Sequence, residues 1–81
     1  MMMKKNDVFS AIKHALSVAN KGDQTVTVQL QIIKYYSELK GLSAREFVEE
    51  VGLKPSLVTL FTDSMKLARK LTEAGMNKDR L

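Results

Sequence analysis

The carboxylates and the histidine of this chain are the side chains that could act as catalytic acids or bases or as metal ligands. Glu46, Glu49 and Glu50 follow one another closely, and this spacing could place paired acids on one helix. The exposed, positive end of a helix is nevertheless where solvated acids are expected. His14 is the single histidine and has no second ligand or nucleophile beside it. We therefore expect these side chains to be ordinary surface groups.

Other routes to catalysis or metal binding are also closed by the composition. Cysteine is absent, which excludes a disulfide framework, a thiolate zinc site and a cysteine nucleophile. Ser43 precedes Ala44-Arg45-Glu46, a capping box in which a serine begins a helix. No nucleophile, base and orienting group can be assembled from these residues. We expect a protein that is not an enzyme and that holds no cofactor and no metal.

Basic residues are concentrated towards the two ends of the sequence. The formal net charge is +4, and an acidic stretch at 42–53 separates the basic parts. This balance permits a polyanion partner without requiring one. Lys66, Arg69 and Lys70 could complement a helix dipole or bind phosphates. Tyr35 and Tyr36 are expected at the core and rim of a helix rather than as a base-stacking platform.

Four helical patterns follow one another in the sequence. An alternating apolar pattern at 26–32 would suit a half-buried strand, and we interpret its first residues as an extended segment before the second helix. Gly22, Gly52 and Gly75 follow the first, third and last patterns as stop signals. The predicted helices run from about Asp7 to Asn20, from about Val28 to Lys40, from Ala44 to Val51, and from Pro55 or Ser56 to Ala74, with a flexible tail at 76–81.

The small size of the domain favours a partner subunit. A chain of 9.1 kDa buries only about 60% of its unfolded surface, so that a lone monomer is marginal. The last helix also carries two apolar stripes, although one would cover its own core. We expect a homodimer, and the residues of this dimer or partner interface are Val8, Phe9, Ile12, Leu57, Leu60, Leu67 and Leu71.

Residues 44–63 have the pattern of a helix-turn-helix. Phe47 and Val51 lie one turn apart on the first helix, and Gly52 lets the chain reverse without a clash of a Cβ atom. Val58 and Phe61 then bring the second helix back onto the first. Six apolar positions agree with this arrangement: Phe47, Val48, Val51, Leu53, Val58 and Phe61.

From Val28 to Gly75 the chain resembles the three-helix core of the MarR-like (multiple antibiotic resistance regulator) winged-helix proteins. The resemblance is carried by Gln31-Ile32-Ile33, Gly41-Leu42-Ser43-Ala44-Arg45-Glu46-Phe47 and Val51-Gly52-Leu53-Lys54-Pro55-Ser56-Leu57-Val58-Thr59. In that family the helix after the turn enters the DNA major groove, and two-fold dimers read paired half-sites. The resemblance implies groove contacts from Ser56, Thr59, Leu60 and Asp63, and phosphate contacts from Arg45, Lys54 and Lys66.

The sequence therefore predicts one all-α domain over 1–81, with four helices, a helix-turn-helix and no wing, because 76–81 is too short for a β-hairpin. We expect a dimeric, DNA-binding regulator of transcription. The alternative is a protein-interaction module that uses Leu57, Leu60 and Leu67 to bind and inhibit another regulator, as an antirepressor would. No apolar run is long enough for a signal peptide or a membrane span, so we expect a cytoplasmic protein with no membrane partner.

Overall fold

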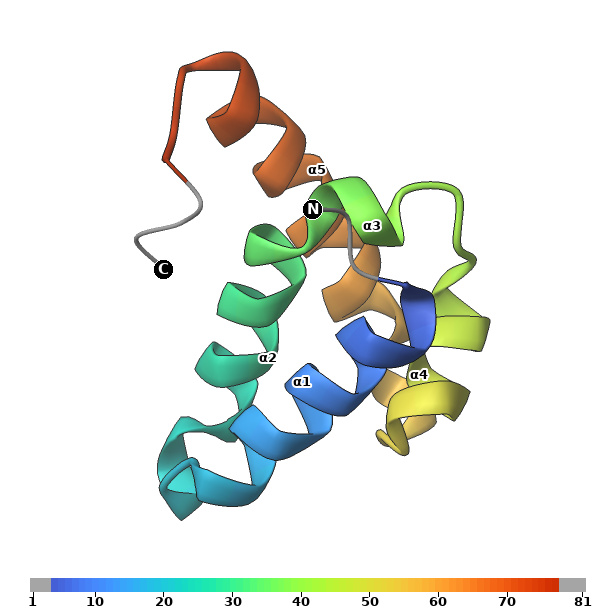
Figure 1. The fold of residues 1–81 in the computed structure, drawn as a ribbon. Coiled ribbons are helices and arrows are strands. Elements are labelled where there is room, and N and C mark those ends of the chain that lie inside the picture. Colours follow the sequence, from blue (N-terminus) through green and yellow to red (C-terminus); the bar gives the residue numbers. More distant parts are fainter. Residues whose placement is uncertain (1–3, 78–81) are drawn as a thin grey trace.

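The structure is a computed structural model that describes residues 4–77. Within this range the chain forms helices and no strand, as Figure 1 shows, so the predicted all-α class without a wing is confirmed. Residues 1–3 of the predicted domain and the last four residues of the predicted tail lie outside the described range. The elements are α1 (Lys5–Val18), η1 (Lys21–Asp23), α2 (Gln24–Lys34), α3 (Tyr36–Leu39), α4 (Ala44–Val51), η2 (Pro55–Leu57) and α5 (Val58–Glu73), where η denotes a short 3₁₀ helix.

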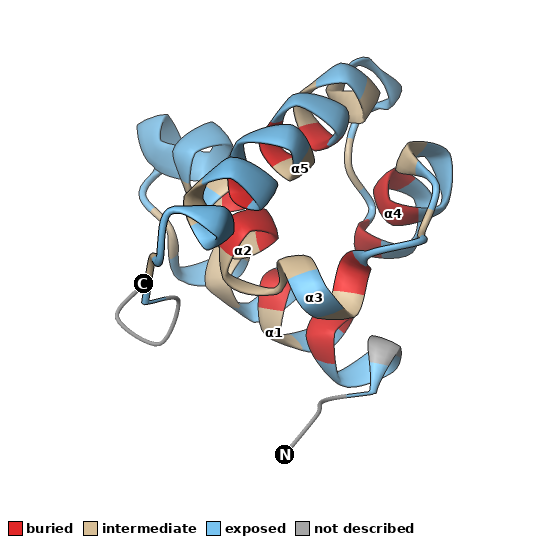
Figure 2. Cartoon of the chain, turned by 90° about the horizontal axis from the view of Figure 1, so that it is seen from above, coloured by how far each residue is buried: buried red, intermediate tan, exposed pale blue. Residues whose placement is uncertain are grey.

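A single hydrophobic core lies between α1, α2, α4 and α5, whose buried residues face one another (Figure 2). Val8, Phe9 and Ile12 supply its α1 side and are buried within the domain. Their prediction as part of a dimer interface was therefore wrong, because the same periodic stripe already covers this core. The remaining buried members of the core are Val28, Ile32, Leu39, Phe47, Val48, Val51 and Phe61.

The second helix differs most from its prediction. It begins at Gln24, four residues earlier than expected, and the alternating stretch is helical rather than extended. Val28 and Ile32 lie one turn apart and are both buried, while Val26 and Leu30 are exposed on another face. The apolar alternation thus reflects two faces of one helix.

A break at Tyr35 divides the predicted second helix into α2 and α3. Tyr35 has φ −103° and ψ 24°, away from the helical region, and its N–H donates to the carbonyl oxygen of Gln31 at 3.0 Å. The chain then turns into α3, whose Leu39 is buried in the core. The observed fold therefore has five α-helices among the described residues where four were predicted.

The last helix ends close to the predicted stop signal. Gly75 has φ +90°, the left-handed conformation that glycine adopts most readily, and the Met76 N–H donates to the Leu71 carbonyl at 3.0 Å. Along its length α5 packs against α2, and it buries the small side chains of Ser64 and Ala68.

Candidate nucleic-acid interface

The turn between α4 and α5 is built from short, local hydrogen bonds. Ser43 caps α4, since its hydroxyl oxygen accepts the Glu46 N–H at 3.1 Å, as the capping-box pattern predicts. At the other end Gly52 has φ +81°, and the N–H groups of Gly52 and Leu53 donate to the Val48 carbonyl at 3.0 and 2.9 Å. Gly52 thus reverses the chain at the predicted position.

An aromatic pair fixes the orientation of α5 relative to α4. The rings of Phe47 and Phe61 stack with their centroids 4.5 Å apart and their planes at 27°. Both side chains are buried, and Val51 is buried beside them in the same core. The helix-turn-helix expected at 44–63 is therefore formed by α4, the turn and the first part of α5.

The start of α5 presents polar and cationic groups to solvent. Pro55 begins the 3₁₀ turn η2, and the exposed side chains of Lys54 and Ser56 flank it. No side chain caps η2 or α5 with a hydrogen bond. The positive end of the helix is consequently open to an anionic group such as a phosphate.

An exposed stripe of polar side chains continues from this start along α5. Thr59, Asp63, Lys66 and Lys70 recur at steps of three and four residues and are all exposed. Thr59, Asp63 and Lys66, together with Ser56, were expected to contact a DNA groove or a phosphate. Leu60 was expected there too, but it is half-buried and packs against the hydrophobic core. Part of its surface is therefore used by the domain itself, and the groove contact from Leu60 stays a prediction.

The two helices of the motif differ in the charge of their exposed faces. The outer face of α4 carries Glu46, Glu49 and Glu50 together with Arg45, all of them exposed. Its excess negative charge repels a polyanion, so that Arg45 is the least suited of the three predicted phosphate contacts. Among residues 4–77 the only salt bridge joins Arg69 Nε to Glu73 Oε1 at 4.0 Å, and both side chains are exposed. Lys54 and Lys66 therefore have no ion-pair partner in this part of the chain.

Comparison with known proteins supports the motif that the geometry shows. A family model described as an HTH-like domain matches residues 4–74. The chain belongs to this family. No curated protein and no solved structure matches the chain. The family match covers the whole helical part of the HTH-like domain and establishes the helix-turn-helix, at a coarser level than the MarR-like resemblance.

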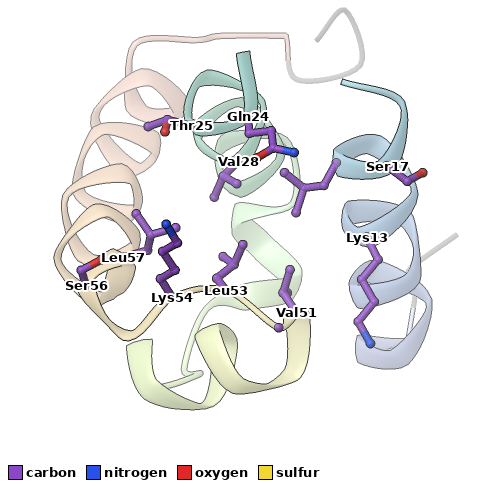
Figure 3. A pocket seen from close by; sticks show the side chains of 12 residues that line it. Lys13, Ser17, Gln24, Thr25, Val28, Val51, Leu53, Lys54, Ser56 and Leu57 are labelled. Atoms are coloured by element: carbon purple, nitrogen blue, oxygen red, sulfur yellow. The ribbon is translucent and has the colours of Figure 1, made fainter. Parts of the chain in front are cut away.

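The sequence pattern of this HTH-like domain did not indicate that Lys13 lies near the turn. Lys13 of α1 and Lys54 of the turn both line a cavity of about 700 Å³, whose floor includes Val28, Leu53 and Leu57 (Figure 3). No acidic residue lines this cavity. Lys13 is far from the turn in sequence, and only the packing of α1 against α4 brings the two lysines to one hollow.

Two kinds of site are not found in the described part of the HTH-like domain. Between residues 4 and 77 no helix is long and apolar enough to cross a membrane. Within the same residues no group of three or more histidine and carboxylate side chains could hold a metal ion.

Proposed function

We propose that this HTH-like domain protein is a small, dimeric, DNA-binding regulator of transcription whose α5 enters the major groove. The observation that carries the proposal is the exposed stripe of α5, which begins at an uncapped helix start and continues through Thr59 and Lys66. An α-helix fits the major groove, and hydroxyl and amine donors are the groups that contact base edges and phosphates there.

The distribution of charge supports an approach from the α5 side. Lys54 lies at the positive end of α5, and Lys66 and Lys70 extend the same exposed surface. The three glutamates of α4 lie on a different helix, whose outer face would be kept away from the phosphates. Asp63 interrupts the stripe, and near a groove it would serve as an acceptor rather than as a phosphate contact.

The alternative of an inhibitory protein-interaction module receives less support. It requires Leu57, Leu60 and Leu67 to face a partner, but Leu57 and Leu60 are half-buried and pack against the core. Leu67 alone of the three is exposed. A partner helix seated on these leucines would first have to displace the domain's own packing.

The test is fluorescence anisotropy of a labelled duplex of mixed sequence, titrated with the protein at several salt concentrations. The affinity should fall steeply with salt, and Lys54→Gln and Lys66→Gln should each lower the salt slope by about 1. Lys4→Gln is the matched control, because Lys4 is exposed at the start of α1 and does not line the cavity beside the turn. Absence of duplex binding at low salt, or an equal effect of all three variants, would contradict the proposal.

A further inference from the structure

The outer face of α2 is apolar along the middle of the helix, with Asp23 before its first residue and Lys34 at its end. From Gln24 to Ile33 the helix contains no charged residue. Val26 and Leu30 lie one turn apart on this face, with 54% and 44% of their surface exposed. Depletion of charge together with exposed apolar side chains distinguishes the centre of a protein interface from ordinary surface.

The same apolar surface continues onto α5, which packs along α2. Leu67 is 48% exposed, and it follows Ser64, which is buried, by one turn. The opposite flank of α5, with Thr62, Met65 and Arg69, faces the loop between α3 and α4. Leu67 therefore lies on the flank of α5 that borders α2. We refer to Val26, Leu30 and Leu67 as the α2 face.

The distribution of charge on the α2 face, which has charged residues only at the two ends of α2, indicates what covers it. A two-fold axis brings residues near it close to their own copies, so like charges would meet there. The outer surfaces of the other long helices carry charges that such an axis would oppose, for example Lys13 on α1, Glu49 on α4 and Lys66 on α5. Two antiparallel copies of α2 can meet without this cost, because their uncharged middles face each other and Asp23 at one end lies towards Lys34 of the other copy.

We propose that a second copy of this chain docks on the α2 face, with α2 against α2 about a two-fold axis. The proposal refines the dimer of the proposed function, since it replaces the buried α1 residues by exposed residues of α2. It leaves the polar stripe of α5 free, because Thr59 and Lys66 lie on another part of that helix. The pairing itself does not depend on DNA.

Sedimentation equilibrium without DNA tests the proposal. The unaltered protein should be a dimer, and Leu30→Lys and Leu30→Glu should each shift it to monomer by placing like charges near the axis. Val18→Lys is the matched control, because Val18 is 69% exposed on α1 and lies outside the α2 face. It should remain a dimer. A mixture of equal amounts of the Leu30→Lys and Leu30→Glu proteins should recover the dimer, since opposite charges then face each other.

Circular dichroism of each variant shows whether the helices are retained, and the mixture separates lost pairing from lost folding. Three results would overturn the proposal: a monomer of the unaltered protein up to its highest soluble concentration, a dimer that persists in both folded Leu30 variants, or a mixture that stays monomeric. If one of them occurs while duplex binding is retained, the α2 pairing fails and the proposed DNA interface stands. If duplex binding is absent while the protein forms the expected dimer, the proposed DNA interface fails and the α2 pairing stands.

Discussion

Replacing Gly52 by alanine should destabilise the protein through backbone conformation alone. An added Cβ would meet no atom within 4 Å apart from those of the adjacent residues, so no clash with the rest of the fold contributes, but Gly52 has φ +81°. A left-handed conformation costs a residue with a Cβ about 1–2 kcal/mol, and the reduced entropy of the unfolded chain returns about 0.4–1 kcal/mol. The free energy of unfolding should therefore fall by roughly 1 kcal/mol. For a domain of this size, that corresponds to a melting temperature lower by about 4–8 °C.

Gly22→Ala is the matched control for this substitution. Its added Cβ also meets nothing within 4 Å, but Gly22 does not have a positive φ. Alanine there should raise the free energy of unfolding by about 0.4–1 kcal/mol, because only the unfolded-state term remains. Urea unfolding followed by circular dichroism measures both variants. If Gly52→Ala proves as stable as Gly22→Ala, the turn does not depend on the left-handed glycine and the reasoning is refuted.

Three further substitutions test individual parts of the fold by the same unfolding assay. Ser43→Ala should lower the free energy of unfolding by about 1 kcal/mol, because the Glu46 N–H loses its cap; an unchanged value would show that water replaces it. Ser64→Ala should raise it by about 1 kcal/mol, since the Ser64 hydroxyl is buried without a hydrogen-bond partner; a loss would reveal a partner. Leu60→Ala should lower it by about 1–2 kcal/mol and leave the affinity for duplex DNA at a fixed salt concentration unchanged, because Leu60 packs against the core; a weaker affinity of the folded variant would place Leu60 in the interface.

The parts of the fold that depend on local sequence could be predicted. The N-cap at Ser43, the turn at Gly52 and the stop at Gly75 each follow from hydrogen bonds or backbone angles within a few residues. The pairing of Phe47 with Phe61 followed from the spacing of apolar residues on either side of the turn. Local rules therefore located the helix-turn-helix correctly.

Features set by tertiary packing could not be predicted in the same way. Val8, Phe9 and Ile12 form an apolar stripe, and such a stripe looks the same whether it covers its own core or a partner. The alternating residues around Val28 fit a strand locally, and only the packing of α2 on α5 shows that one face is buried while Val26 remains exposed. Proximity of Lys13 to the turn depends on contacts distant in sequence. Each of these predictions failed because the sequence does not show which face of a helix packs against which neighbouring helix.

The central claim is that α5, and not α4, contacts DNA. Titration of the isotopically labelled protein with a short duplex, followed residue by residue in amide nitrogen–proton NMR spectra, tests this most directly. The largest chemical-shift changes should occur at Ser56, Thr59 and Lys66, while Glu49 and Glu50 on the outer face of α4 change little. Changes concentrated on α4, or no changes at low salt, would contradict the claim.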